Sequence, residues 1–174
     1  MEFLSTLKER IPDYAKDIRL NLDGVVARSS LDAADAVGAA LAAAYAAWSK
    51  TIVDAIRGSG ALSETDANAA LTAAALMGMN NVWYPYVEMG DDEDLKTQRA
   101  ELRMNAYATH GGVDRKRFEL FALAASIVGK CHFCVASHYK MLKENGLTAQ
   151  QLRDVGRIAA VINAAAQALD AEGA

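Results

Sequence analysis

Alanine content is the feature that most constrains the fold of this chain. Alanine fills 36 of the 174 positions, whereas only Pro12 and Pro85 are proline. Alanine is the strongest helix former, and proline breaks helices because it lacks an amide donor and clashes with the preceding turn. No stretch alternates polar and apolar residues as a half-buried strand would. The composition therefore predicts an all-α protein.

The length and polarity of the chain fit one globular unit. A chain of 18.6 kDa is within the usual size of one domain and can bury a core without metal or disulfide staples. The hydrophobic content of 52% excludes disorder over most of the sequence. We therefore expect a single domain spanning residues 1–174.

The charge pattern limits the classes of partner. A net charge of −4 argues against a nucleic-acid partner. No apolar run reaches the roughly 20 residues that cross a bilayer, so we expect no membrane partner. The N-terminal segment has no long apolar stretch, which argues against a signal peptide. The expected compartment is therefore the cytoplasm, where thiols are held reduced.

Capping residues and glycines divide the first half of the chain into helices. Ser, Thr and Asp favour helix starts because their side chains accept a free backbone N–H. The expected helices are Glu2–Arg10, Asp13–Leu22, Leu31–Trp48 with Ser30 as its N-cap, a short segment ending near Gly58, and a long helix from Glu64 through the 77–87 region with Ser63 as its N-cap.

The second half begins with an acidic run, residues 89–98, which we expect to be a solvated loop. Leu102–Tyr107 is expected to form a helical turn or two, ended by Gly111 and Gly112. Asp114 is the expected N-cap of a helix to Val128, with Gly129 as the left-handed residue that ends it. Two more helices are expected, 131–144 and, after a capping box of Thr148 and Gln151, one to Ala171.

Two alanine-rich segments resemble each other. Leu71–Gly78 and Ala122–Gly129 align at an offset of 51 residues. The alignment indicates either an old duplication or simply two alanine-rich helices that end in glycine.

The two cysteines of the chain, Cys131 and Cys134, stand three residues apart, and His138 follows Cys134 by four residues. Three interpretations compete. A zinc site would use both cysteines and His138, with His132 or His110 as the fourth ligand. Inert packing would bury both cysteines as small apolar residues. A dithiol–disulfide centre suits the Cys-x-x-Cys spacing best, because such a pair in a cytosolic protein is usually catalytic.

Helical spacing supports the redox interpretation. If Cys131 opens a helix, the positive end of the helix dipole stabilises its thiolate. Cys134 and His138 then share its face, and a histidine can accept a thiol proton near neutral pH. Glu119 is the candidate partner of that histidine, although on spacing alone it either faces solvent or has a buried role. His132 is either a tuning group for the thiols or an exposed side chain.

The order Glu119-x11-Cys131-x2-Cys134-x3-His138 resembles the signature of the AhpD-like alkyl hydroperoxidases, within the carboxymuconolactone decarboxylase-like superfamily. Residues 12–22, 77–82 and 102–105 resemble the same family, so the similarity covers nearly the whole chain. The resemblance implies an AhpD-like helical bundle that forms a homotrimer. It implies no tightly bound cofactor and no metal.

The activity that the resemblance implies is antioxidant. Such proteins reduce a peroxiredoxin partner, AhpC, and weakly reduce alkyl hydroperoxides directly. Their electrons come from dihydrolipoamide carried on the lipoylated acyltransferase of a 2-oxoacid dehydrogenase complex. Two alternatives stay open from the residues: a redox-sensing interaction protein, or a non-peroxidase member of the superfamily.

The resemblance also implies a role for each site residue. Cys134 would form the sulfenic acid, and Cys131 would be its proton donor and disulfide partner. His138 and Glu119 would form a proton relay. The helix dipole favours Cys131 as the more acidic thiol, but a buried relay can outweigh a dipole effect of about 0.3–1 kcal/mol. These proteins often have histidine immediately before the second cysteine. Here Phe133 holds that position and the histidine stands one position earlier, so the family pattern assigns no role to His132.

Overall fold

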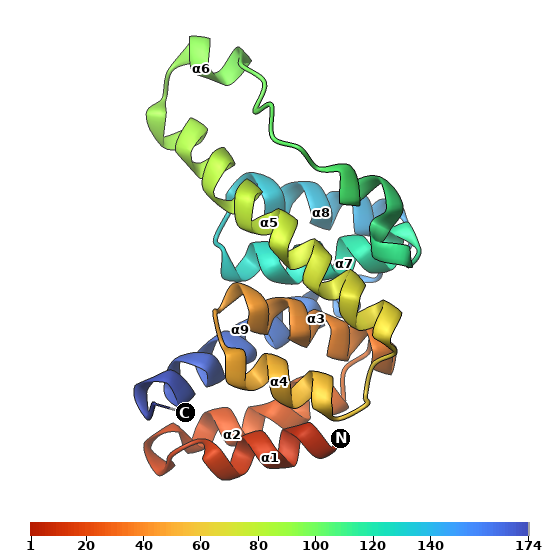
Figure 1. Ribbon diagram of the computed structural model, residues 1–174, viewed down its shortest axis with the longest axis vertical. Helices are drawn as coiled ribbons and strands as arrows, with labels where there is room; N and C mark the ends of the chain where they lie inside the picture. The colour runs from red at the N-terminus through yellow and green to blue at the C-terminus, as the bar shows by residue number, and fades with distance from the viewer. Residues whose placement is uncertain (174) are drawn as a thin grey trace.

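The computed structural model describes residues 1–173, and every regular element in that range is helical, which confirms the predicted class (Figure 1). The elements are α1 (Glu2–Arg10), η1 (Asp13–Ala15), α2 (Lys16–Leu22), η2 (Asp23–Ala27), α3 (Ala33–Ala46), α4 (Lys50–Gly58), α5 (Glu64–Gly90), α6 (Glu93–Thr97), η3 (Asn105–Gly112), α7 (Arg115–Val128), α8 (His132–Glu144) and α9 (Ala149–Ala171).

Helix α3 is the centre of the core. Every residue from Ala36 to Ala44 is buried, because α4, α5, α7 and α9 surround this helix. Its small side chains let neighbouring helices approach closely. At Gly38 even a methyl group would overlap the ring of Phe121 on α7. The alanine-rich segment therefore builds the interior of the domain.

The start of α3 corrects the prediction that Ser30 caps it. The helix begins at Ala33, with Asp32 at the N-cap position and no side-chain cap. Ser30 instead donates both its backbone N–H (2.9 Å) and its hydroxyl (2.7 Å) to Asp154 on α9. A buried carboxylate offers this serine a stronger partner than a free helix amide, so the loop is tied to α9.

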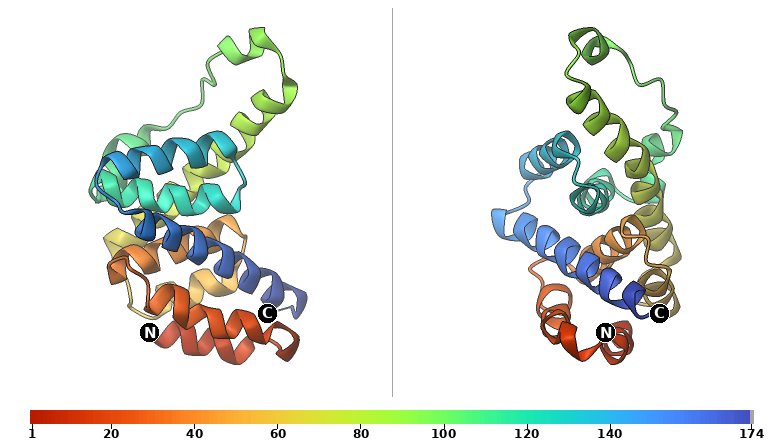
Figure 2. Two further views of the ribbon diagram at one scale, coloured as in Figure 1. Left: turned by 180° about the vertical axis from the view of Figure 1, so that it is seen from behind. Right: turned by 90° about the vertical axis from the view of Figure 1, so that its left-hand side faces the viewer.

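Helix α5 crosses the core, and its C-terminal end and the chain that follows it form an arm at one end of the molecule, opposite α1 and α2 (Figures 1 and 2). The helix continues through Pro85 to Gly90, and Asp92 then caps the short α6. The expected loop over residues 89–98 is therefore partly helical, although its acidic side chains are exposed as predicted. Within residues 1–173, no helix is both long and apolar enough to cross a bilayer.

Helices α7, α8 and α9 follow the predicted pattern closely. Asp114 accepts the N–H of Arg117 and caps α7, and Thr148 with Gln151 forms the predicted capping box of α9. The two similar alanine-rich segments fall on α5 and α7, which pack against each other. Gly129 follows α7, whereas Gly78 lies inside α5, so only one of them marks a helix end.

Candidate active site

Helix α7 places a carboxylate in the middle of the protein. Residues 118–126 are all buried, because α3, α5, α8 and α9 pack around this helix. Glu119 therefore has no solvent-facing side, and its exposed fraction is 0%. Of the two alternatives for Glu119, the structure shows the buried one.

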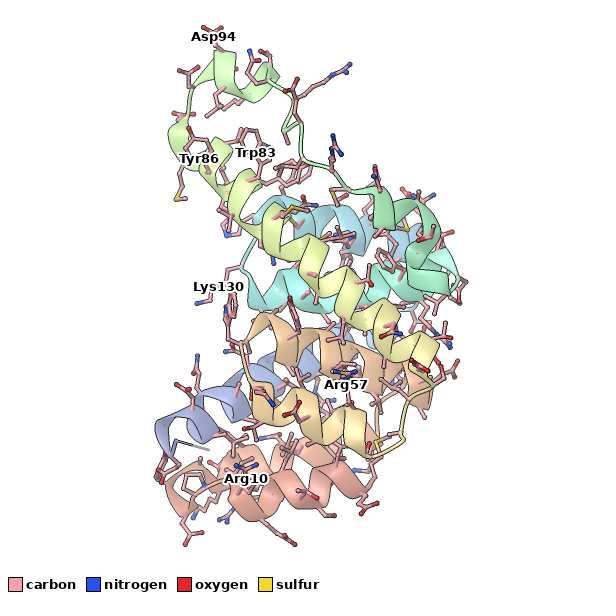
Figure 3. The ribbon with its side chains drawn as sticks, in the orientation of Figure 1. Arg10, Arg57, Trp83, Tyr86, Asp94 and Lys130 are labelled. Carbon is pink, nitrogen blue, oxygen red and sulfur yellow. A yellow bond between two sulfur atoms is a disulfide. The ribbon has the colours of Figure 1, made fainter. Side chains whose placement is uncertain are left out.

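The turn from α7 to α8 brings the cysteines beside α5. Gly129 was expected to be the left-handed residue, and this prediction is wrong: its φ is −70°, and Lys130 takes the left-handed conformation at φ 56°. Glycine stands at 129 for a different reason. A Cβ there would overlap the side chain of Asn81, whose amide donates to the Ala125 carbonyl at 3.2 Å. Lys130 itself points away from the protein (Figure 3).

Cys131 is the N-cap residue of α8. Its sulfur accepts the backbone N–H of Cys134 at 3.2 Å and lies 3.9 Å from the Asn80 carbonyl oxygen. The two cysteines are joined as a disulfide, with their Cα atoms 5.3 Å apart. Both residues are buried, and Cys134, His138 and Leu142 form the buried face of α8.

His138 reaches Glu119 from the next helix. Its Nδ1 lies 2.5 Å from Glu119 Oε2, and its Nε2 lies 3.2 Å from the sulfur of Met77 on α5. A carboxylate beside Nδ1 holds the proton on that nitrogen, which leaves Nε2 as the basic atom of a neutral ring. The pair therefore presents a histidine base of fixed tautomer and orientation.

The second oxygen of Glu119 also has partners. Tyr107, on η3, donates its hydroxyl to Oε1, and Arg115 Nε lies 3.8 Å from the same oxygen. Burial alone would raise the pKa of Glu119, but hydrogen bonds from His138 and Tyr107 and the nearby positive charges lower it below its ordinary value. The site thus holds an ionised carboxylate in the protein interior.

A cavity of about 390 Å³ opens beside these groups. Cys134 and His138 contribute to its wall, and Cys131 does not. Most of the remaining wall is apolar or aromatic, from Met77, Tyr84, Met104, Tyr107, Ala108 and Phe133. Such a cavity suits a small apolar ligand next to a few polar groups, and Cys134 is the cysteine that lines it.

The other histidines lie outside this cluster. His132 is exposed at the start of α8, with Nδ1 3.5 Å from Glu88 on α5. His110 packs its ring near Tyr107 and Phe118. Among residues 1–173, no group of three or more His, Cys, Asp or Glu side chains is arranged as a metal-binding cluster.

Tyr107, Met77 and Arg115 were not identified from the sequence as members of the site. Arg115 stands one helical turn before Glu119, and this i,i+4 spacing was an available signal. Tyr107 and Met77 carry no such signal, because they reach Glu119 and His138 only through the packing of separate elements.

The C-terminal part of the chain matches a known protein family. The carboxymuconolactone decarboxylase family matches residues 93–174, which include η3, α7, α8 and α9 and therefore the whole Glu119–His138 region. The all-helical fold and the buried cysteine pair on α8 are consistent with that match.

Relatives that match nearly the whole chain identify the family within that class. Alkyl hydroperoxide reductase AhpD of Rhodospirillum centenum is 44% identical over 98% of this chain and 92% of its own length. The AhpD proteins of Bradyrhizobium sp. (97% and 93% covered) and Frankia alni (97% and 91% covered) are each 41% identical. The chain belongs to the AhpD family, as the sequence motifs predicted.

Proposed function

We propose that this protein is a thiol-dependent alkyl hydroperoxide reductase. The observation that carries the proposal is the cavity wall shared by Cys134 and His138, with a second cysteine within disulfide reach of the first. The apolar lining suits the alkyl part of an organic hydroperoxide. The names of the relatives support the same activity.

The reaction begins with the reduced dithiol. His138 Nε2 accepts the proton of the Cys134 thiol, and the thiolate attacks the terminal peroxide oxygen. The O–O bond breaks, Cys134 becomes a sulfenic acid, and the alkoxide takes a proton from the Cys131 thiol to leave as an alcohol. Glu119 holds the Nδ1 proton and stabilises the imidazolium, as a relay partner does.

A disulfide closes the oxidative half of the cycle. The Cys131 thiolate attacks the Cys134 sulfur, and hydroxide leaves and takes the proton held by His138, which gives water. One dithiol and one hydroperoxide thus become one disulfide, one alcohol and one water. The backbone N–H of Cys134 and the start of α8 stabilise negative charge on Cys131 during this step.

Thiol–disulfide exchange completes the cycle in the proposal. Dihydrolipoamide on the acyltransferase of a 2-oxoacid dehydrogenase complex supplies two electrons and two protons to the disulfide. The reduced dithiol then serves an AhpC-type peroxiredoxin, or a hydroperoxide directly at a lower rate. We propose a cytoplasmic homotrimer with no tightly bound cofactor, and we leave His132 as a group that tunes the dithiol from outside the cavity.

The test is NADH consumption in a coupled mixture of this protein, lipoamide, dihydrolipoamide dehydrogenase and an alkyl hydroperoxide, with and without an AhpC-type peroxiredoxin. We expect turnover that rises with the peroxiredoxin, disappears in Cys134→Ser and falls strongly in His138→Phe. Silence of the wild-type protein in every mixture, with a disulfide that is still reducible, would contradict the reductase and favour a redox sensor.

A further inference from the structure

Tyr107 occupies a position between the cavity and Glu119. It lies on η3 (Asn105–Gly112), its ring is half-buried, and one side of it lines the cavity that Cys134 and His138 share. The ring packs edge-on against Phe118, with centroids 5.6 Å apart, and its hydroxyl donates to Glu119 Oε1. Tyr107 is therefore held by packing at one end and by the carboxylate at the other.

Each oxygen of Glu119 thus has its own hydrogen-bond donor. His138 on α8 serves Oε2, and Tyr107 on η3 serves Oε1. Arg115, on the same helix as Glu119, is the other charged group near the carboxylate, and its side chain is mostly exposed. His110 is the remaining titratable neighbour of Tyr107, with ring centroids 5.9 Å apart. These two donors lie on separate elements, and together they keep the carboxylate group of Glu119 from rotating.

The hydroxyl of Tyr107 acts only as a donor. Burial and the hydrogen bond to Glu119 raise the pKa of Tyr107 above its ordinary value, so the phenol keeps its proton. A donor to a carboxylate withdraws part of its negative charge. A carboxylate that shares its charge with Tyr107 stabilises the imidazolium of His138 less than a free one would.

We propose that Tyr107 is a positioning residue that aims Glu119 at His138 Nδ1 and limits how strongly Glu119 stabilises the imidazolium. His138 Nδ1 thereby faces the carboxylate, which leaves Nε2 as the atom that accepts the Cys134 proton. For its effect on turnover this inference rests on the proposed function, but the contact between Tyr107 and Glu119 acts on His138 whether or not a peroxide is reduced.

The test compares Tyr107→Phe with the wild-type protein. The variant keeps the ring and its packing and removes only the hydroxyl. Tyr14→Phe is the matched control, because Tyr14 donates its hydroxyl to a carboxylate, Glu172, at 3.0 Å on the exposed surface. The rate of dithiol oxidation by tert-butyl hydroperoxide is followed by loss of free thiols between about pH 5 and pH 9, across the range in which histidine titrates.

We expect the acid limb of the Tyr107→Phe profile to move to higher pH. A move of about one pH unit would lower the rate about 10-fold on that limb, and the two proteins would converge at alkaline pH. Tyr14→Phe should follow the wild-type profile. An equal loss of rate at every pH would indicate a merely structural role, and an unchanged profile would equally overturn the proposal.

A second measurement does not depend on peroxidase activity. The ring signals of His138 are titrated by NMR in the wild-type and Tyr107→Phe proteins, with His138→Phe used for assignment. We expect the titration midpoint of His138 to rise in Tyr107→Phe. If the protein proves inactive toward peroxides, this shift still supports the positioning role, and its absence in the folded variant refutes it.

Discussion

The Glu119 carboxylate is buried at a cost in free energy, and it is also the proposed relay partner of His138. A fully buried carboxylate is costly unless its oxygens are hydrogen-bonded and its charge is paired. His138, Tyr107 and Arg115 meet that need together. The same contacts that make the charge tolerable also orient the imidazole, so the fold and the proposed relay depend on the same atoms.

Replacement of Glu119 by Gln should mainly lower the turnover rate and should change the stability of the fold less. The amide keeps the size of the carboxylate but removes the charge that stabilises an imidazolium, so we expect a loss of about 10²-fold in the peroxide reaction. The NADH-coupled assay measures it. Glu144→Gln is the control, because Glu144 is exposed on α8 and lies 3.9 Å from Lys140. Equal activity of Glu119→Gln and the wild type would refute the relay.

At the scale of elements, the α7–α8 turn depends on close packing against α5. Gly129→Ala places a methyl group against the Asn81 side chain. We expect a destabilisation of about 1–3 kcal/mol, since an overpacked site must displace its neighbours. Urea unfolding measures the free-energy difference.

Gly156→Ala on α9 is the matched control for this prediction. A methyl group at 156 would meet no atom within 4 Å. Alanine is favoured over glycine inside a helix by about 0.5–1 kcal/mol, so this variant should be neutral or more stable. If both variants have the same stability, packing at Asn81 is not the reason for glycine at 129.

The contact between α9 and the loop before α3 predicts a dependence of stability on pH. Burial would raise the pKa of Asp154, but hydrogen bonds from the Ser30 backbone and side chain, followed by those from Arg153 and Arg157, hold it well below its ordinary value. Because this pKa is lowered in the folded protein, the carboxylate contributes its full stabilisation at pH values above the pKa of aspartate in the unfolded chain, which is about 3.9. The contribution is lost as the pH falls below that value.

Asp154→Asn should therefore be less stable than the wild type by about 1–3 kcal/mol at pH 7, because hydrogen bonds to a charged group are lost. The difference should shrink as the pH falls from about 5 toward 2, where the wild-type carboxylate also becomes neutral. Urea unfolding at a series of pH values tests this. Asp170→Asn, on an exposed position of the same helix, should show no comparable effect.

At the scale of the whole molecule, helix class and most boundaries were predictable because their causes are local. Asp114, Ser63 and Thr148 cap the helices that directly follow them. The incorrect predictions have distant causes. Ser30 bonds to Asp154, 124 positions away, and Gly129 faces Asn81 on another helix. No pattern in one sequence reports such partners.

The candidate site was likewise predictable where its causes are local and unpredictable where they are distant. Cys131 caps α8, and Cys134 and His138 lie on it, so spacing alone predicts that the three residues are neighbours. Glu119 joins them from α7, and family resemblance rather than spacing indicated its role. Tyr107 contributes through η3, a segment whose path is set by packing on α5 and α7. Its contribution to the site became visible only in three dimensions.

The proposed trimer gives a prediction for the whole molecule. Val82, Tyr86 and Met89 are large apolar residues on one face of the arm, and their exposed fractions are 69%, 52% and 79%. Figure 3 shows Tyr86 on the projecting end of α5 and Asp94 at the tip of the arm. Exposed apolar surface of this kind is typical of a protein contact. We expect a second copy of the chain to cover it.

Light scattering should then give about three times the chain mass of 18.6 kDa. Val82→Glu combined with Met89→Glu should lower the measured mass, because charged side chains are disfavoured at the core of an interface. Leu20→Glu is the control, since Leu20 is also exposed but lies on α2 at the other end of the protein. A wild-type monomer at micromolar concentration would refute the trimer.

The short distance between the two cysteines has a consequence for survival under oxidative stress. A sulfenic acid that meets a second peroxide becomes a sulfinic acid, which most cells cannot reverse. Here the resolving sulfur sits at the N-cap of the same helix, with Cα atoms 5.3 Å apart, and no element has to unwind to bring it closer. Under the proposed chemistry, condensation competes with a second oxidation at every turnover. If that chemistry operates, we expect the sulfenic acid to be short-lived and the protein to resist inactivation by excess hydroperoxide.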